Sequence, residues 1–496
     1  MPYQDMRAFV SRLEQDGQLR RLDLPLEGRR GKTELQALMR HLHSGSDSPA
    51  LVLNKVQGIG PANTKTLFNL FGTRRRVAMA VDVNTWEEVR AKHALVASEP
   101  NMWHKPRVVS SREAPCKDVV IRDVDIARDL PNIWFGKEGP SYITGAVVVT
   151  KDIETGRRNV GWYRLTSFVD AHHPLGGTYD PSRAKADLAG FFWWNPPMSG
   201  IGMHIAKANA AGRPLEVACA VMCDPAIHLA AATGMPPDTD EFDFAGGLRG
   251  APVDLVKCET VDLEVPATAE WVIEGKMVPG QQEPIGWHSN PVGYYDRAHI
   301  LPIMRVGCIT HRRDPLWYST MEMVPPFDHM YLGLLTIEGE LISELRRKLP
   351  EVKNILVTPN LCYIVQLHVD GATKPHPEFG KYVIHAVWGA AGRWARTAKL
   401  VIVVGPDVDP SDWAKIEWAI MTRVQPYSDI IINQSGQAML LDPSGRKNEQ
   451  GAASTSEQMG IDATIKIPER FREYPEVSDA APADVAAIAK KLKGLL

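Results

Sequence analysis

The sequence predicts an α/β protein of the α+β type, with a β-rich central domain between two domains in which helices and strands alternate. The first hundred or so residues show helical periodicity, and the middle of the chain shows short apolar strands separated by turns. Helices and strands alternate again after Pro326. A chain of 496 residues is long enough for about three domains. We therefore expect domains over 1–114, 115–318 and 319–470, and a tail helix within 471–496.

The N-terminal domain is predicted to begin with an amphipathic helix. Asp5 can cap this helix and Gly17 can end it, and the residues between them place apolar side chains at helical spacing: Met6, Phe9, Val10 and Leu13. The next predicted elements are a helix over 33–43, a strand and loop over 50–64, and a helix over 85–97. This order indicates a small α/β unit.

The central domain is predicted to consist mainly of antiparallel strands. Its strand-like segments are DVVIRDVDI, GAVVVT, NVGWYRLT, LEVACAVM, VDLVKCETVDLEV, AEWVIEGKMV, LPIMRVGCIT and PLWYSTM. Such a series is typical of a barrel or a sandwich.

The C-terminal part is predicted to alternate helices with strands. In order, it offers the helix LTIEGELISELRRKL, the strands NILVTP, LCYIVQLHV and KLVIVVG, a helix over 411–422 and the terminal helix PADVAAIAKKLKGLL. The polar segment over 444–456 is expected to be a mobile loop or lid.

Composition excludes some classes of function. Lysine and arginine number 56 against 59 aspartate and glutamate, a net charge of −3, which does not suit nucleic-acid binding through bulk positive charge. No apolar stretch reaches the roughly 18 residues of a membrane span, and the N-terminal segment lacks the apolar core of a signal peptide. We therefore expect a cytoplasmic protein without nucleic-acid or membrane partners.

Local motifs do not identify a reaction, since GxGxxG, GxxxxGK[ST], HExxH and GxSxG are all missing from the sequence. A dispersed set of polar residues lies in the central region, flanked by glycines and prolines that let a ligand approach the backbone: Asn159, Arg164, His204, Glu241 and Glu283. The spacing of Asn159 and Arg164 puts them on opposite faces of a regular strand, unless a bulge at Gly161 brings them together. On spacing alone, an asparagine at a strand end and a surface arginine are the favoured explanation of that pair.

Five segments carry a family resemblance. They are NVGWYR (159–164), GMH (202–204), residues 240–280, THRRDPLWYSTMEMVPPFDHMYLG (310–333) and VIVVGPDVDPSDWAKIEWAIMTRVQP (401–426). In register across nearly the whole chain, they resemble the UbiD-like decarboxylase family. These enzymes are reversible (de)carboxylases of aromatic and α,β-unsaturated acids that depend on prenylated FMN. The resemblance implies a central split-barrel flavin domain and a C-terminal α/β domain that usually mediates oligomerisation.

The resemblance also implies cofactor and metal sites. Asn159, His204 and Glu241 stand where the family holds a divalent metal, usually Mn²⁺, that bridges to the flavin phosphate. Two oxygen ligands and one imidazole suit such an ion. K⁺ is expected as a second ion, Met203 and Met235 are expected along the cofactor, and Arg393 falls where a basic residue contacts the phosphate.

The catalytic residues implied by the resemblance include one departure. In the family, one arginine and two glutamates position the carboxylate and protonate the carbon after CO₂ leaves. Arg164 matches the arginine, and Glu283 matches the first glutamate of E-G-P-F-G-E. The place of the second glutamate is held by Trp287, or by Val292 in another alignment.

The missing glutamate leaves the identity of the acid open. Either Glu283 is the acid, or a histidine replaces the lost carboxylate, with His288 and His329 the nearest candidates. His329 stands where members acting on phenolic acids can carry a histidine near the ring, although a histidine packed on Pro325 and Pro326 at a helix start would look the same.

These features predict a non-oxidative decarboxylase, reversible in principle, of a phenolic or N-heteroaromatic acid. The expected partners are a small aromatic carboxylic acid, CO₂, a flavin prenyltransferase that supplies the cofactor, and further copies of the chain in a homodimer or homohexamer. The alternatives are an acrylic- or cinnamic-acid decarboxylase, a split-barrel flavin oxidoreductase and an inactive scaffold subunit. Residues 170–199 form an insertion relative to the family, and its aromatic run FFWW is expected either at the mouth of the active site or at a subunit interface.

Overall fold

The structure is a computed structural model with two compact units. The larger consists of Met1–Ser343, Val357–Leu361 and Met439–Ser454, and the smaller of Glu344–Leu356, Cys362–Ala438 and Thr455–Leu496. The residues that the structure describes are 3–44, 48–61, 64–176, 178–192, 199–236, 238–390, 397–437, 439, 441–447, 453–466, 474–475, 477–480 and 482–492.

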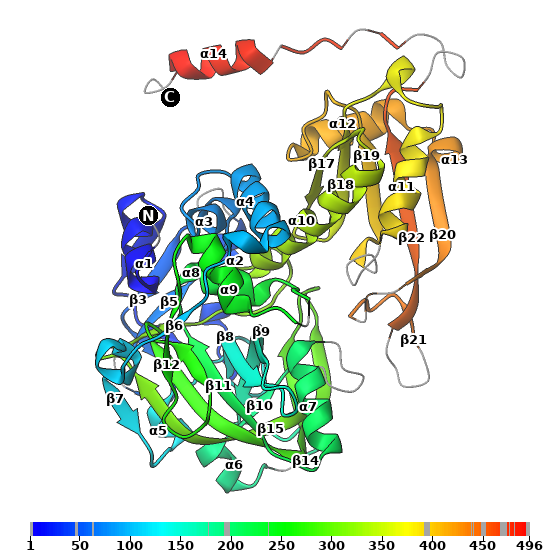
Figure 1. Ribbon diagram of the computed structural model, residues 1–496. Coiled ribbons are helices and arrows are strands. Elements are labelled where there is room, and N and C mark those ends of the chain that lie inside the picture. The colour runs from blue at the N-terminus through cyan, green and yellow to red at the C-terminus, as the bar shows by residue number, and fades with distance from the viewer. Residues whose placement is uncertain are drawn as a thin grey trace. The chain divides into compact units, whose positions relative to one another are not determined.

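The N-terminal part of the larger unit confirms the predicted small α/β unit (Figure 1). Helix α1 (Met6–Gln15) starts where the Asp5 side chain accepts a hydrogen bond from the Ala8 backbone N–H, and its four predicted apolar residues are buried. The other elements are β1 (Leu19–Leu22), β2 (Leu26–Glu27), α2 (Glu34–Ser44), β3 (Ala50–Leu53), β4 (Val56–Gln57), β5 (Lys65–Phe68), α3 (Arg74–Met79), α4 (Trp86–Ser98) and the 3-10 helix η1 (Pro100–Met102). Strands β1, β3 and β5 form one sheet with β16 (Leu316–Tyr318), and β2 pairs with β4.

A closed six-stranded β-barrel forms the centre of the larger unit. Its strands are β8 (Tyr142–Lys151), β9 (Arg158–Ser167), β10 (Asp187–Gly190), β11 (Leu215–Val221), β14 (Trp271–Ser289) and β15 (Tyr295–His311). The short β10 pairs with both β9 and β15 and so closes the ring, and β7 (Val119–Ile121) extends it beside β15. The predicted β-rich domain is therefore a barrel. Its closing strand comes from within 170–199, the segment expected only as an insertion.

Helices cover the barrel and carry several of the predicted site residues. Helix α7 (Gly200–Ala210) packs on β9 and β14, and α8 (Pro225–Ala232) and α9 (Glu241–Arg249) pack on each other and on β9. The remaining elements are β6 (Arg107–Val108), η2 (Ser111–Glu113), η3 (Pro115–Lys117), α5 (Ile126–Asp129), α6 (Pro181–Ala186), β12 (Asp254–Lys257) and β13 (Glu264–Pro266). Strands β6, β12 and β13 form a small separate sheet.

The register of β8 and β9 decides whether β9 has a bulge at Gly161, the alternative that the sequence left open. Gly161 pairs regularly with Val148, so β9 has no bulge there. The register shift lies on β8 instead, between Ile143 and Ala146, opposite Arg164. Gly145 in this stretch has a φ of +88°, and the Tyr318 ring lies 2.8 Å from where a Cβ would stand, so only glycine fits.

The smaller unit contains a mainly parallel sheet with the strand order β17-β18-β19-β22-β20. Its elements are β17 (Val352–Val357), β18 (Cys362–Leu367), η4 (Gly371–Thr373), α11 (Phe379–Gly389), β19 (Leu400–Val404), α12 (Trp413–Arg423), α13 (Pro426–Asp429), β20 (Ile430–Gln437), β22 (Ala453–Ala463) and α14 (Pro482–Leu492). Helix α10 (Met330–Lys348) contains the boundary between the units. Buried side chains of the sheet and α12 form the core, among them Ile364, Ile402 and Ile416.

Two expectations about the C-terminal region have different outcomes. The predicted loop over 444–456 contains strand β21 (Arg446–Lys447) and the start of β22, so the expectation of a loop is wrong for those residues. Helix α14 lies within the predicted tail segment. Within the described part of the chain, every helix is too short or too polar to cross a bilayer.

Candidate active site

Three predicted metal ligands converge at one end of β8 and β9. Asn159 lies on β9, His204 on α7, and Glu241 is the first residue of α9. The Val160 backbone N–H donates to Glu241 Oε2 at 2.9 Å. Thr150, the β8 partner of Asn159, hydrogen-bonds His204 Nδ1 through its hydroxyl at 2.9 Å. These links join β9, α7 and α9 around the three side chains.

Asn159 occupies a space that glycine leaves open. A Cβ built on Gly200, the first residue of α7, would lie 1.7 Å from Asn159 Oδ1, so the helix start is shaped around this amide. Asn159 Nδ2 is buried and has no hydrogen-bond partner within the described residues. An unpaired amide N–H donor is costly to bury, and a bound group that accepts a hydrogen bond from Nδ2 would remove that cost, while Oδ1 is the atom that can bind a cation.

The other two side chains also suit a cation. Burial raises the pKa of Glu241 to about 8, because an ionised carboxylate is poorly solvated there. Burial likewise lowers the pKa of His204, which keeps its imidazole neutral and able to bind a metal. A divalent cation favours the ionised carboxylate of Glu241 and the neutral imidazole of His204. One amide, one carboxylate and one imidazole suit a borderline-hard ion. The residues present therefore fit the expected metal.

Charged neighbours hold the start of α9 in place. Arg158 pairs with Asp240 at 3.0 Å and Glu264 at 3.3 Å, and its guanidinium lies over the Phe242 ring at 5.3 Å. The Asp240 carboxylate also accepts a hydrogen bond from the Phe242 backbone N–H and caps the helix. Glu241 thus begins a helix whose first turn is fixed on both sides.

A second cluster is centred on Arg164 of β9. Its Nη1 donates to the Ser289 carbonyl at 2.9 Å, and its Nη2 lies 3.1 Å from Glu322 Oε2. The guanidinium lies over the rings of Tyr142 and Phe191, at 5.1 and 4.6 Å from their centres. Phe191 follows β10 directly, and its backbone N–H donates to the Arg164 carbonyl at 3.0 Å. Two rings and two oxygens therefore fix the arginine.

Glu322 connects Arg164 to His329. Its Oε1 lies 3.7 Å from His329 Nε2, and the His329 ring lies between Trp162 and Phe327 at ring distances of 4.8 and 4.9 Å. Burial would raise the pKa of Glu322, but the Arg164 charge and the contact with His329 outweigh it and hold that pKa below its usual value. The group is therefore a carboxylate at neutral pH, bound between a guanidinium and an imidazole.

Glu138 is a second carboxylate close to this cluster. Ser289 Oγ donates to Glu138 Oε1 at 2.7 Å, and Oε2 has no hydrogen-bond partner among the described residues. Burial raises the pKa of Glu138 to about 7, against the opposing influence of Ser289 and Arg164. Near neutral pH this carboxyl is therefore partly protonated.

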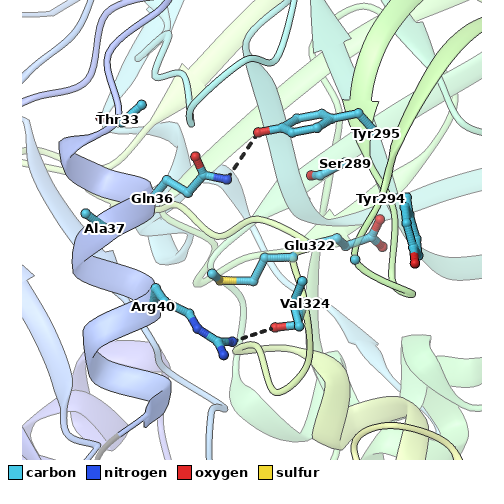
Figure 2. A pocket seen from close by; sticks show the side chains of 11 residues that line it. Thr33, Gln36, Ala37, Arg40, Ser289, Tyr294, Tyr295, Glu322 and Val324 are labelled. Carbon is cyan, nitrogen blue, oxygen red and sulfur yellow. Dashed lines mark hydrogen bonds between the residues drawn. The ribbon is translucent and has the colours of Figure 1, made fainter.

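A pocket of about 400 Å³ adjoins the Arg164 cluster. Glu322 and Ser289, the two partners of Arg164, both line it. Figure 2 shows α2 on one side of the pocket, where Gln36 donates to the Tyr295 hydroxyl and Arg40 donates to the Val324 carbonyl. The other lining residues are Thr33, Ala37, Gly293, Tyr294 and Met323. A small molecule in this pocket would lie beside the carboxylate that holds Arg164.

Three family models match the chain in succession. They describe the N-terminal domain of 3-octaprenyl-4-hydroxybenzoate carboxy-lyase (residues 10–94), its Rift-related domain (107–325) and its C-terminal domain (330–463). The chain belongs to the UbiD carboxy-lyase family. Membership makes the protein a carboxy-lyase, and the family description names an aromatic acid as substrate.

Solved structures of UbiD-class enzymes resemble the whole chain. HmfF from Pelotomaculum thermopropionicum, in complex with FMN, is 29% identical with a TM-score of 0.80, over 97% of this chain and 99% of that one. An evolved dimeric form of HmfF in complex with prenylated FMN is also 29% identical, with a TM-score of 0.77 over the same shares. Vanillic acid decarboxylase from Sedimentibacter hydroxybenzoicus, in open form, is 26% identical with a TM-score of 0.83, over 100% of this chain and 99% of that one. The predicted UbiD fold is confirmed.

Two of the residues considered as the acid lie in other contacts of this UbiD fold. Glu283 of β14 pairs with Arg183 at 2.8 Å, and this arginine also binds Asp187. His288, near the end of β14, packs on Phe191 at a ring distance of 4.8 Å and faces Asp296. Of the four predicted catalytic residues, Arg164 and His329 are thus joined through Glu322, whereas Glu283 and His288 contact other side chains.

The remaining predicted cofactor residues are partly located. Met203 precedes His204 on α7 and is 38% exposed, and Met235 follows α8 and is partly buried. Arg393 lies outside the described residues, as do two of the four aromatic residues of FFWW. Of the other two, Phe191 contacts Arg164 and Phe192 packs on Tyr163.

Glu322 and Glu138 are residues that sequence reasoning missed. Glu322 lies within the segment over 310–333 that carried the resemblance, where it is a single charge in the apolar run STMEMVPP. A charge in such a run is worth noting, because a buried carboxylate needs a partner. Glu138 lies in FGKEGPS, a glycine-rich stretch that looks like an ordinary loop, and it offers no comparable signal.

Proposed function

We propose that the protein is a non-oxidative decarboxylase, reversible in principle, of a phenolic or N-heteroaromatic carboxylic acid, with prenylated FMN as cofactor. The observation that carries this proposal is the chain Arg164–Glu322–His329 beside the pocket. It combines a cation for the substrate carboxylate, a carboxyl for proton transfer, and an imidazole for a ring hydroxyl or N–H.

Arg164 would bind and orient the substrate carboxylate. Its planar guanidinium can hold a carboxylate through two parallel hydrogen bonds. The rings of Tyr142 and Phe191 fix the plane of the guanidinium and keep water from it, so the substrate group enters a defined orientation.

Glu322 would protonate the carbon from which CO₂ has left. In the free protein Arg164 holds Glu322 as a carboxylate. A substrate carboxylate at Arg164 adds a negative charge beside Glu322 and takes up part of the arginine's charge, and both changes raise the pKa of Glu322. Substrate binding itself thus converts Glu322 into an acid. His329 Nε2, 3.7 Å away, is placed to pass the proton to it.

His329 would also select the substrate ring. An imidazole can accept a proton from a ring hydroxyl or ring N–H, which raises the electron density at the carbon to be protonated. Trp162 and Phe327 pack against its ring and fix its orientation.

Asn159, His204 and Glu241 would hold Mn²⁺ together with the cofactor phosphate. Prenylated FMN, when bound, supplies the electron sink that an aryl carbanion lacks. In this proposal a flavin prenyltransferase provides the cofactor, K⁺ is a second ion, and the chain assembles as a homodimer or homohexamer.

The deciding experiment uses protein co-produced with a flavin prenyltransferase. CO₂ release and H/D exchange in D₂O are measured on phenolic, N-heteroaromatic and cinnamic acids, and the bound flavin is identified by mass spectrometry. Ring deuteration of a phenolic or heteroaromatic acid that requires prenylated FMN is the expected result.

Other outcomes point to the alternatives. A styrene formed from cinnamate would assign the acrylic-acid branch, and bleaching of bound plain FMN by NADPH would indicate an oxidoreductase. A metal-loaded, flavin-loaded protein that exchanges no acid in the panel would contradict the proposal and favour a scaffold subunit.

A further inference from the structure

A cluster of two histidines and an aspartate lies on the β14–β15 hairpin, apart from the three predicted metal ligands. His288 pairs in register with Asp296, and His299 follows three residues later on β15. His288 Nε2 lies 3.6 Å and His299 Nε2 3.9 Å from Asp296 Oδ2, and one donor atom from each side chain falls within 4.8 Å of the others. Among the described residues, this is the group of three or more His, Cys, Asp or Glu side chains close enough to share one ion.

The cluster is arranged before any ligand arrives. His288 is 2% exposed, and its ring is held between the rings of Phe191 and His299, at 4.8 Å from each. The separation of His288 Nε2 from Asp296 Oδ2 is longer than an ordinary hydrogen bond, and His288 Nδ1 has no hydrogen-bond partner in the described part of the chain. The 3.6 Å separation from Asp296 Oδ2 leaves His288 Nε2 without a short hydrogen bond to that carboxylate, so this nitrogen can bind an ion.

The donor set indicates which ion fits. Two imidazole nitrogens and one carboxylate oxygen suit Zn²⁺ and related transition ions, whereas Ca²⁺ and Mg²⁺ prefer oxygen alone. Donor atoms bound to one zinc at about 2.1 Å lie roughly 3.4 Å apart. Because the donor atoms of this cluster lie within 4.8 Å of one another, the cluster needs to contract by at most about 1.4 Å. We propose that His288, Asp296 and His299 form a second metal site, for a divalent transition ion of the zinc type, distinct from the Asn159 site.

An ion there would fix one wall of the pocket. Asp296 accepts a hydrogen bond from Asn290 Nδ2, and Asn290 Oδ1 accepts hydrogen bonds from the backbone N–H groups of Val292 and Tyr294. The same turn begins at Ser289, whose carbonyl holds Arg164. The ion would therefore stabilise both the Arg164 acceptor and the pocket wall that contains Tyr294.

The test is metal binding by the full-length protein after chelator treatment. Zn²⁺ is titrated calorimetrically, and Co²⁺ is titrated in parallel by visible absorption. We expect two equivalents in the wild type, one at each site. His299→Ala and Asp296→Asn should each weaken one equivalent by more than about 100-fold, since outer-shell partners alone are worth roughly 10- to 100-fold. Zn²⁺ should also raise the Tm of the wild type more than that of either variant.

Two controls make the result specific. His204→Ala should lose the metal equivalent bound at Asn159, His204 and Glu241 and keep the one bound at the histidine cluster. His172→Gln changes a histidine outside both sites and should keep both equivalents. Two substitutions at the cluster guard against misfolding of either one, and circular dichroism checks each. If His299→Ala and Asp296→Asn both bind Zn²⁺ and Co²⁺ as the wild type does, the second site does not exist.

Discussion

Arg164 binds the Glu322 carboxylate in the structure and the substrate carboxylate in the proposed reaction. The two anions compete for one guanidinium, so the protonation state of Glu322 depends on whether substrate is present. Such coupling keeps the site from holding a protonated acid before there is a carbon to protonate. A pKa measured in the free protein therefore does not identify the acid. The acid is identified by comparing the activities of variants in which each candidate carboxylate is replaced.

Replacing Glu322 by Gln should lower kcat by roughly 10²–10⁴-fold, the usual range for one general acid. Glu283→Gln is the matched control, because that carboxylate pairs with Arg183 rather than with Arg164. Steady-state CO₂ release, with flavin and metal content measured for each variant, checks both. Wild-type turnover in Glu322→Gln together with a dead Glu283→Gln would return the role of acid to Glu283.

Glu138 should make the protein less stable as the pH rises. Its folded-state pKa of about 7 lies above the ordinary value of 4.5, so the folded state binds the proton more tightly than the unfolded state. That contribution to stability is complete below about pH 4.5 and is lost as the pH rises through 7, at up to about 1.4 kcal/mol per pH unit. Urea unfolding of the wild type and Glu138→Gln is measured between pH 5 and 8. As the pH rises, the free energy of unfolding of the wild type should fall relative to that of the variant. A difference that does not change with pH would contradict the assignment.

The residues of the two clusters differ in how far the sequence predicts them. Asn159 and Arg164 lie in one short motif, so a single resemblance points to both. Glu322 lies after β16, far from β9 in the sequence, and only folding brings it into contact with Arg164. The register shift opposite Arg164 is on β8, beside Gly145, where the Tyr318 ring leaves no room for a side chain, and only the folded structure shows this packing.

At the level of elements, the start of α7 is shaped by its neighbour on β9. Gly200 has a helical backbone that alanine can adopt, but its missing side chain leaves the space that Asn159 fills. Helix propensity alone would favour alanine at this position. The glycine is therefore explained by the space that Asn159 of β9 needs and not by the stability of α7.

Gly200→Ala should therefore keep the fold and lose the metal. The added methyl group forces the Asn159 amide to turn away, which removes one ligand without changing the other two. Gly333→Ala on α10 is the matched control, because a methyl group added there would meet nothing within 4 Å and helix propensity alone predicts a gain of about 1 kcal/mol. Mn²⁺ content and thermal unfolding are measured for both. A Gly200→Ala protein with full Mn²⁺ content would exclude Asn159 as a ligand.

At the scale of the whole molecule, large apolar side chains remain exposed on the smaller unit. Met421 of α12 is 77% exposed, Tyr427 of α13 fully exposed and Ile432 of β20 52% exposed. Subunit contacts are enriched in aromatic residues and methionine, so these side chains are our candidates for a contact between copies of the chain. The sequence placed these elements in a C-terminal α/β region, but apolar residues on a helix look the same in sequence whether they face a core or a partner.

If the chain assembles as proposed, the double variant Met421→Glu/Tyr427→Glu should form smaller assemblies than the wild type, because charges buried at a subunit contact lack partners. Leu175→Glu, at an 80% exposed position in the larger unit, is the control and should leave the mass unchanged. Light scattering coupled to size-exclusion chromatography measures the mass of each. An unchanged mass for the double variant would place the subunit contact elsewhere.

Strand β10 has a consequence for how the family scaffold can be shortened. Among the described residues, Asp187–Gly190 are the ones that join β9 to β15, and they come from a segment that looks like an addition to the family pattern. Deleting it would convert the closed barrel into an open sheet with two unpaired edge strands. Each edge strand could then pair with a strand of another chain. The segment that looks most dispensable in the sequence is therefore the one that keeps neighbouring molecules from joining edge to edge into aggregates.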